Sequence, residues 1–572
     1  MKYFLTIFLL LIKIGVLIAQ NPVDPLYYHQ YGKSKLSTPN ALIKDIEIRR
    51  VTTVKDNAVR LAYNKASDKF YYLTTNGQLF QLNFDSGIHY LKAQSEDHGI
   101  NETLGLAISS SGIFYVSGTN KNSENLTNVG RVSRGVLTDD KILWETLIET
   151  EEYPLSNTAF DHSFNGIVLS PSEKTLFINS GSRTDHGEVH SVNGRYPDSR
   201  EVPLTAKLLQ VPADTNNLYL PNNYDSLKFY GYIYAEGLRN TFDLAFDSKG
   251  NLFGTENSGD RDDSEELNII VKGGHYGFPW LMGGNLTPMQ FDGYNVENDL
   301  FVNTNSLAYR NGYFYNDPDF PLKPDSITFI EGLKNIGPDA DRKRGEDGQV
   351  YDVSESNLEI RTFTSHRSPL GLVFDTMKTM GGDYTGDGFL LGWTGSNDSN
   401  LLQRMGDEGD DMFHLKLIDS GDGYSVSVKR IVSGFLNPID AEIIDNKIYV
   451  LEFKSSWINN GLTTSIYEIT FPSILNQANQ KFSSKVKFVL YQNYPNPFNA
   501  STQIRFELEE ATKVRLEVFN SIGQKVMELV NGQQSAGYHT ATFDASGLSS
   551  GVYLYKLTTP SFTQTKKMLL IK

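Results

Sequence analysis

The sequence predicts an all-β chain, a six-bladed β-propeller followed by a small antiparallel β-sandwich. Tyr, Phe and Gly are frequent (31, 33 and 48 of 572 residues), which favours short strands and tight turns. Patterns with the period of a helix are scarce. An apolar strand, a polar turn and an aromatic-rich strand recur with uneven loops between copies, which is typical of propeller blades that pack against their neighbours. The six copies begin at Leu61, Leu104, Asn165, Phe242, Leu370 and Pro438.

Residues 1–19 have the pattern of a secretory signal peptide. Lys2 precedes an apolar run that ends at Ala19, so Gln20 is the expected mature N-terminus. A membrane anchor is the alternative, but the run is short and contains Lys13, which favours cleavage. No other segment is long and apolar enough to span a bilayer, so no membrane span is expected after removal of the signal.

The composition disfavours several classes of protein. Hydrophobic residues make up 39% of the chain and aromatic residues 12%, enough for large cores, so disorder is not expected. The net charge of −16 disfavours nucleic-acid binding, which needs a basic surface, and suits a protein that binds cations. The chain has no cysteine, so a large core and bound metal must replace disulfides in an exported protein.

The predicted propeller occupies residues 20–470, and its strongest candidate site lies within 236–280. A strand pair there ends in an acidic loop at 260–263. Carboxylate-dense, glycine-bounded loops suit hard cations bound by oxygen. Arg239 and Asn240, just before the strand pair, could hold an anion at the same rim. The alternative is a calcium-stiffened loop without chemistry, because fold and site are separate questions.

The order of these residues resembles the soluble glucose/sorbosone dehydrogenase family, six-bladed propellers that use pyrroloquinoline quinone and calcium. The resemblance covers roughly residues 45–470. It implies that His162 is the base that takes the proton of a sugar hydroxyl while hydride moves to the quinone, and that Asp161 orients it. Histidine suits this task because its ordinary pKa lies near neutrality. Without the resemblance, a hydrogen-bonded turn is the better explanation of this Asp-His pair, and the match to the family makes the catalytic role an equal alternative.

The resemblance also implies cofactor and calcium contacts. Arg239 and Asn240 match the quinone-contacting pair of the family, and an arginine there could stabilise charge on the reduced quinone. Ser258 and Gly259 stand where the family uses Gly-Pro carbonyls to hold the catalytic calcium. Because carbonyl ligation needs no particular side chain, calcium remains expected at this position.

A further, structural calcium is implied at Glu266 and Tyr276. The preceding loop carries two extra residues, Ser264 and Glu265, so its geometry can differ from that of the family.

The chain departs from the family where cations bind the carboxylates of the quinone. The matching stretches of the fifth and sixth blades, 391–396 and 434–438, contain no Lys or Arg. Unpaired carboxylates in a partly desolvated cleft are costly. Either other cations substitute or quinone binding has been lost. The candidate substitutes are Lys429, Arg430, Arg367 and Lys454.

A histidine-containing segment precedes the candidate site. His186 and His190, with Asp185 and Glu188, could bind zinc if the segment were helical. The surrounding residues do not have a helical pattern, so a loop that lines the propeller mouth is expected instead.

The sequence pattern changes after residue 470. Residues 471–489 are polar and are expected to form a linker, and 490–572 alternate apolar and polar residues as in a small antiparallel sandwich. From the YPNPFN opening to the basic end, this segment resembles the C-terminal sorting domain of type IX secretion cargo. The resemblance implies export through the periplasm and outer membrane, with the type IX machinery as partner and release or attachment at the cell surface. An adhesive or carbohydrate-binding sandwich is the alternative.

The leading functional hypothesis is an exported oxidoreductase that oxidises a sugar or related alcohol with pyrroloquinoline quinone and Ca²⁺. The alternative is a non-catalytic, calcium-stabilised propeller that binds glycans or a surface partner.

Overall fold

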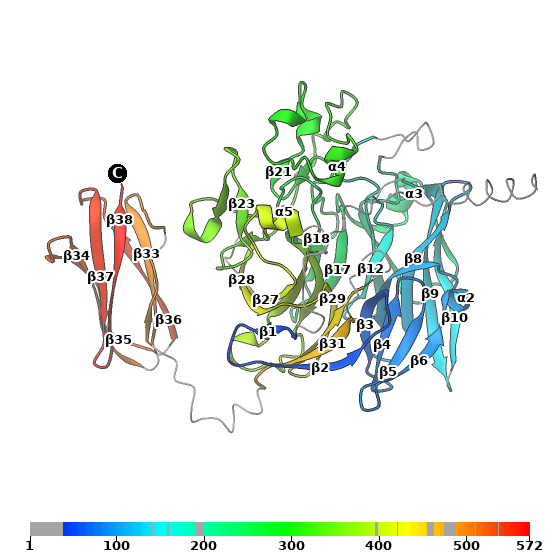
Figure 1. Cartoon of the computed structure of the whole chain (residues 1–572), viewed down its shortest axis with the longest axis horizontal. Helices are drawn as coiled ribbons and strands as arrows, with labels where there is room; N and C mark the ends of the chain where they lie inside the picture. Colours follow the sequence, from blue (N-terminus) through cyan, green and yellow to red (C-terminus); the bar gives the residue numbers. More distant parts are fainter. Residues whose placement is uncertain are drawn as a thin grey trace, which may run out of the picture. The chain divides into compact units, whose positions relative to one another are not determined.

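The computed structural model describes residues 38–571, apart from 140, 157–159, 190–199, 395–398, 420, 422, 455–462, 474–487, 494, 509–510 and 536. The expected signal peptide, His190 and most of the expected linker lie outside the described residues. The chain divides into two compact units, one up to Asn476 and one from Gln477 onward (Figure 1).

Six antiparallel sheets of the first unit are the blades of the predicted propeller. Blade 1 contains β3 (Ala58–Asn64), β4 (Lys69–Thr74), β5 (Leu79–Asn83) and β6 (Ile88–Ala93). Blade 2 contains β7 (Glu102–Ile108), β8 (Phe114–Asn122), β9 (Thr127–Thr138) and β10 (Lys141–Thr150), with β11 (Tyr153–Pro154) and β15 (Leu218–Leu220) at its edges. Blade 3 contains β12 (Phe164–Leu169), β13 (Thr175–Ser180), β14 (Lys207–Pro212) and β16 (Ile233–Glu236).

The remaining blades complete the ring. Blade 4 contains β17 (Thr241–Phe246), β18 (Leu252–Glu256) and β19 (Glu266–Ile270). Blade 5 contains β25 (Ser368–Phe374), β26 (Gly388–Trp393), β27 (Asp411–Asp419) and β28 (Tyr424–Ser433), with β1 (Asn40–Ala41) and β22 (Lys334–Asn335) paired to β28. Blade 6 contains β29 (Pro438–Ile444), β30 (Lys447–Glu452), β31 (Ser465–Thr470) and β2 (Glu47–Thr53).

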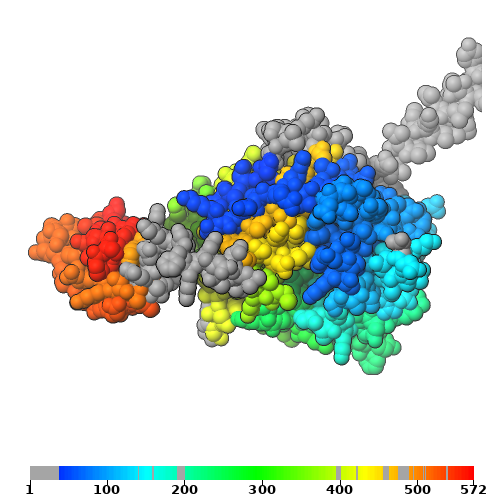
Figure 2. Space-filling model, turned by 90° about the horizontal axis from the view of Figure 1, so that it is seen from below, coloured from blue at the N-terminus to red at the C-terminus, as the bar shows by residue number. Residues whose placement is uncertain are grey.

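The innermost strands of the blades close a circle. β3, β7, β12, β17, β25 and β29 each contact the next, and β29 contacts β3 again. The last blade is completed by β2, which comes from the start of the described chain and pairs with β31. Figure 2 shows this N-terminal segment (blue) against residues of the last blade (yellow and orange). The closed ring confirms the predicted six-bladed propeller.

Large apolar side chains fill the spaces between neighbouring blades. One cluster joins Tyr115 of blade 2 with Phe164 and Leu209 of blade 3, all of them buried. Burial of one such side chain contributes roughly 1.5–3 kcal/mol. The turn between β17 and β18 needs Gly250, whose φ of 87° is a left-handed conformation that side chains disfavour. Packing of this kind gives the inner strands a rigid frame on which loops can position functional groups.

Loops and short elements between blades 4 and 5 form a cap on one side of the ring (Figure 1). The connection between blades 4 and 5 therefore has structure of its own. This cap contains β20 (Leu281–Met282), β21 (Asn285–Leu286), η2 (Pro288–Gln290), η3 (Val296–Asn298), α4 (Leu307–Arg310), β23 (Arg342–Arg344), β24 (Val350–Asp352) and η4 (Val353–Glu355). Other short helices are α2 (Ser95–His98), α3 (Tyr224–Phe229), η5 (Gly382–Tyr384) and α5 (Ser399–Arg404). Among the described residues, none of the helices has the length and apolar character needed to cross a membrane.

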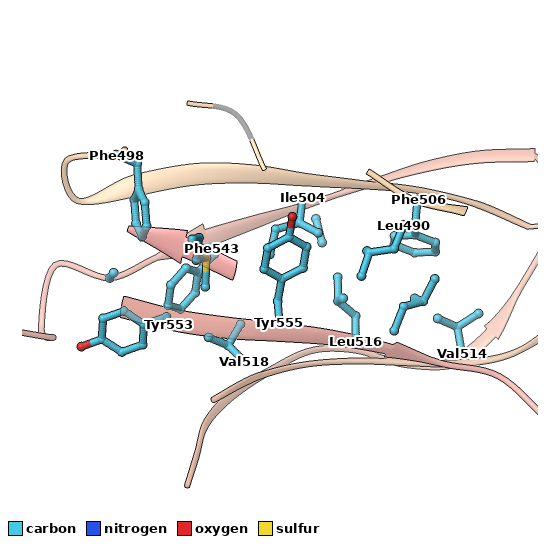
Figure 3. Packing of buried hydrophobic residues seen from close by; sticks show 14 of the residues in the cluster. Leu490, Phe498, Ile504, Phe506, Val514, Leu516, Val518, Phe543, Tyr553 and Tyr555 are labelled. Atoms are coloured by element: carbon cyan, nitrogen blue, oxygen red, sulfur yellow. The ribbon is translucent and has the colours of Figure 1, made fainter. Parts of the chain in front are cut away.

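The second unit is a sandwich of two antiparallel sheets, as predicted. One sheet contains β32 (Val489–Leu490), β33 (Ser501–Leu508) and β36 (Gly537–Asp544). The other contains β34 (Thr512–Asn520), β35 (Lys525–Gln534), β37 (Gly551–Thr558) and β38 (Thr563–Leu570). Figure 3 shows Ile504 and Phe506 of the first sheet facing Leu516 and Tyr555 of the second. These buried side chains give the unit its own core.

Candidate active site

A cavity of about 370 Å³ lies at the end of the ring where the inner strands begin. Its wall includes the first residues of several inner strands, such as Phe242 of β17 and Leu370 of β25. Six of the eight predicted site residues line this one cavity: Asp161, His162, Arg239, Asn240, Ser258 and Gly259.

His162 precedes β12 and its ring is held by Ser182. Nδ1 of His162 lies 3.1 Å from Oγ and 3.2 Å from the carbonyl oxygen of Ser182. The hydroxyl of Ser182 donates to the carbonyl of Thr184, so Nδ1 must carry the proton that both Ser182 oxygens accept. Burial, followed by the positive charge of Arg239, lowers the pKa of His162 to about 3. The imidazole is therefore neutral at physiological pH, and Nε2, which has no partner among the described residues, is left as an acceptor in the cavity.

Close packing around His162 depends on a glycine. A Cβ atom at Gly181 would lie 2.4 Å from the Cβ of His162. Any larger residue would push the ring out of place, because atoms at that distance overlap.

Asp161 does not orient His162. Its Oδ2 accepts hydrogen bonds from Nδ2 of Asn128 (3.2 Å) and the backbone N of Ser156 (2.9 Å). Burial raises the pKa of this carboxyl group. The expected orienting role therefore belongs to Ser182, and Asp161 instead ties together the loop that leads into β12.

Arg239 precedes β17 and is anchored on three sides. Its Nε donates to the carbonyl of Asp185 (2.6 Å), Nη2 to Oδ1 of Asp185 (3.0 Å) and Nη1 to the carbonyl of Asn257 (3.0 Å). A guanidinium has five N–H donors, so two remain for a ligand in the cavity. Beside it, Oδ1 of Asn240 accepts from Nδ2 of Asn165 (3.0 Å), which leaves the amide nitrogen of Asn240 available.

Ser258 and Gly259 line the cavity in the loop that follows β18. The N–H of Ser258 donates to Glu265 (2.7 Å) and its hydroxyl donates to the carbonyl of Asp263 (2.9 Å). Within the described chain, neither carbonyl of the pair accepts a hydrogen bond. A Cβ at Gly259 would lie 2.8 Å from both carboxylate oxygens of Asp185, which explains why glycine stands where the family uses proline. Free carbonyls of this kind are ligands that calcium takes.

Glu266 and Tyr276 line a second, much smaller cavity of about 10 Å³, the size of one water molecule or ion. Oε1 of Glu266 is buried and has no partner in the described part of the chain. Burial raises the pKa of Glu266 to about 8. The hydroxyl of Tyr276 is already used, since it donates to Ile269 and accepts from Val271. A cation here would therefore be held by Glu266 and backbone carbonyls.

No cluster of three or more His, Asp or Glu side chains that could hold a metal occurs in the described ranges. The zinc alternative for His186 is excluded by its contacts, because Nδ1 bonds Asp185 (2.7 Å) and Nε2 bonds the carbonyl of Tyr313 (3.0 Å). His190 lies outside the described residues.

The basic residues suggested as substitutes for the missing cations bind carboxylates elsewhere. Arg367 is buried against Asp411 (2.6 Å) and Asp407 (2.5 Å). Arg430 pairs with Glu408 and Lys454 with Asp56. Neither these three nor Lys429 is among the described residues that line the cavity.

His366 lines the cavity and was not foreseen from the sequence. It immediately precedes Arg367 and β25, and its Nε2 lies 2.8 Å from Oδ1 of Asp262. Its backbone has a φ of 63°, an uncommon conformation for a residue with a side chain. The two partners are 104 residues apart in sequence, so no local pattern could reveal their contact.

A ring of six sheets with a cavity of mixed polar and apolar lining at one end defines a β-propeller with a candidate ligand site. Residues 103–335 match the Glucose / Sorbosone dehydrogenase family, and residues 492–572 match the Secretion system C-terminal sorting domain. The first match lies within the propeller unit and the second within the sandwich unit. The sorting domain marks the chain for type IX secretion, to the cell surface or beyond it.

The chain is also similar to proteins with known names. The chain is 25% identical over 240 residues to quinoprotein glucose dehydrogenase B of Acinetobacter calcoaceticus, covering 36% of this chain and 47% of that protein, about half its length. Similar solved structures include the PQQ-bound aldose sugar dehydrogenase of Streptomyces coelicolor (15% identity, TM-score 0.43, 76% of this chain and 99% of that one). Another is the apo form of the soluble aldose sugar dehydrogenase of Escherichia coli (14% identity, TM-score 0.42, 74% of this chain and 99% of that one).

Proposed function

We propose that this chain is an exported dehydrogenase that oxidises a sugar or related alcohol with pyrroloquinoline quinone and calcium. The observation that carries the proposal is the meeting of His162, Arg239 and the free carbonyls of Ser258 and Gly259 at one cavity. The glucose/sorbosone dehydrogenase domain supports the same class of reaction.

The residues at the cavity suit both calcium and the quinone. The carbonyls of Ser258 and Gly259 would hold calcium, and the unused N–H groups of Arg239 and Asn240 would bind quinone oxygens. When bound, the quinone would supply the acceptor for the hydride, with its two electrons, that leaves the substrate carbon.

His162 would act as the general base. Its neutral ring keeps the Nε2 lone pair at the cavity surface, where it can take the proton of a substrate hydroxyl. Ser182 fixes the tautomer through Nδ1, and Arg239 is held by Asp185 so that its remaining donors are positioned before the ligand arrives.

A non-catalytic propeller that binds glycans or a surface partner is the second candidate, and one observation favours it. Arg367, Arg430 and Lys454, the candidate cations for the carboxylates of the quinone, are paired with other side chains. If these side chains do not contact the quinone, its carboxylates have fewer cationic partners and the quinone binds more weakly.

Titration of the purified full chain with pyrroloquinoline quinone, in calcium and in excess chelator, separates the two candidates. The dehydrogenase proposal predicts calcium-dependent binding at micromolar concentration or tighter, and dye reduction with at least one member of a panel of aldoses. Absence of quinone binding together with retention on glycan supports the second candidate and contradicts the first.

A further inference from the structure

Three cationic side chains gather around one buried carboxylate beside the cavity. Asp262 lies in the acidic loop after β18, and its side chain is fully buried. Oδ2 of Asp262 contacts Arg344 of β23 and lies 3.3 Å from Nη2 of Arg404 of α5, while Oδ1 lies 2.8 Å from Nε2 of His366. The two guanidinium groups outnumber the one carboxylate that both contact, so their positive charge is only partly offset by Asp262.

His366 carries that charge to the cavity surface. Its ring lines the cavity, as does Leu401 of α5, the helix that ends with Arg404. Nε2 is occupied by Asp262, whereas Nδ1 has no partner among the described residues. Burial disfavours the charged ring, but the hydrogen bond to Asp262 and the charges of Asp262 and Glu265 hold the pKa of His366 above its ordinary value. When the ring is protonated, Nδ1 is a charged N–H donor.

The backbone of His366 is held in place for this task. Its N–H donates to Oε1 of Glu265 (2.8 Å), and its φ is 63°. A left-handed conformation is unfavourable for a residue with a Cβ. Strain of this kind occurs at sites where the surrounding contacts enforce the position of a functional group.

We propose that His366 binds a carboxylate of the quinone cofactor and so replaces the Lys and Arg contacts that blades 5 and 6 of this chain lack. Arg344 and Arg404 act behind it by holding Asp262 and offsetting its charge. The inference depends on the proposed function for the identity of the ligand. Asp260 and Glu265 also line the cavity, so a cationic group is needed there before a multiply charged anion can bind.

The test compares two probes, pyrroloquinoline quinone and its trimethyl ester, which keeps the ring but has no carboxylate charge. Both are titrated calorimetrically in calcium against the full chain and the His366→Asn variant. Asparagine tolerates the left-handed backbone better than most residues and removes the charge. We expect about a tenfold loss of affinity for the quinone and no change for the ester.

His414→Asn is the matched control. His414 is a nearly buried histidine on β27 of the same blade, and its Nε2 lies 2.8 Å from Asp387, but it is not among the cavity-lining residues. The His414→Asn variant should bind the quinone and its ester with unchanged affinity. Arg404→Gln, at a side chain that is 25% exposed, is a second test should His366→Asn fail to fold, with an expected loss of about threefold for the quinone alone.

The outcomes are distinct. Equal losses of affinity for the quinone and its ester in the His366→Asn variant would overturn the role of His366. Unchanged affinity for the quinone in both His366→Asn and Arg404→Gln would overturn it as well. Either result would leave the proposed function intact. Failure of the unmodified chain to bind either probe would overturn the proposed function, and this inference with it.

Discussion

Arg239 and Asp185 form a buried ion pair beside the cavity, with Nη2 of Arg239 3.0 Å from Oδ1 of Asp185. The same carboxylate accepts the backbone N–H of Asp260 (3.1 Å) and contacts Nδ1 of His186 (2.7 Å). Asp185 therefore joins the arginine that is proposed to contact the cofactor to the loop whose carbonyls are proposed to hold calcium.

Asp185→Asn should strongly destabilise the propeller. The substitution leaves Arg239 buried without its counterion, and loss of one partner of a buried pair costs about 3–5 kcal/mol. Urea denaturation of the full chain measures the change. Glu359→Gln is the control, because Glu359 and its partner Lys334 are both exposed and such pairs contribute about 1 kcal/mol or less. Similar losses in free energy of unfolding in the two variants would show that Asp185 stabilises the fold no more than an exposed ion pair does.

Gly259→Ala should weaken calcium binding more than it weakens the fold. The new methyl group would meet both carboxylate oxygens of Asp185 at 2.8 Å, so the carbonyls of this loop must shift. We expect a loss of about 1–3 kcal/mol in stability and a smaller rise in melting temperature on adding calcium. Gly547→Ala, at a glycine with open space around it, should change neither quantity. A normal calcium response in Gly259→Ala would remove this loop from the proposed calcium site.

The inner strands of the six blades were predictable because each contains several buried or half-buried apolar side chains, which leaves a strong apolar pattern. The outer strands were not predictable. β6 is largely exposed and lacks that pattern. β2 gains its place only by pairing with β31, Glu47 opposite Thr470, and no local signal encodes a contact over that separation.

In the candidate site, too, some features were predictable from the sequence and others were not. His162 and Arg239 were predicted because they lie beside inner strands, where a family motif remains recognisable. Their partners were not predicted. Ser182 replaces Asp161 as the group that orients His162, and His366 reaches the cavity through Asp262. Both contacts depend on how loops of different blades meet, which the sequence alone does not specify.

Glu266 should make the effect of calcium on the melting temperature depend on pH. Burial raises its pKa to about 8, above the ordinary value near 4.5, so the folded state retains a proton that the unfolded state loses. This group therefore lowers stability as pH rises between those two values. Calcium binding should offset the loss, and its effect on the melting temperature should be larger at pH 8 than at pH 5.5.

The Glu266→Gln variant is the control for this effect. It keeps the size of the side chain but has no charge to titrate, so its melting temperature should respond to calcium equally at both pH values. A calcium response of the unmodified chain that is independent of pH would contradict a cation at Glu266.

Tyr555→Phe should destabilise the sandwich unit alone. The buried hydroxyl of Tyr555 donates to the carbonyl of Tyr491 (2.9 Å) and accepts the N–H of Asn493 (2.8 Å), at the start of the sorting domain (Figure 3). Its removal leaves buried backbone groups unpaired, which costs about 1–3 kcal/mol. Calorimetry of the full chain should show a lower transition for this unit and an unchanged one for the propeller. Tyr553→Phe, at a less buried hydroxyl that bonds only Ser549, should have a smaller effect.

His162→Ala should abolish most turnover without weakening quinone binding. Loss of a general base typically lowers kcat by about 10²–10⁴-fold, while the proposed quinone contacts of Arg239 and Asn240 remain. The unmodified enzyme should also keep its kcat as pH falls from 8 to 5, because the pKa of His162 is lowered to about 3 and the ring stays neutral over that range. Ser182→Ala, which removes one of the two oxygens that hold Nδ1, should reduce kcat by a smaller factor. Unchanged turnover in His162→Ala, or a fall in kcat centred near pH 6.5, would exclude His162 as the base with this environment.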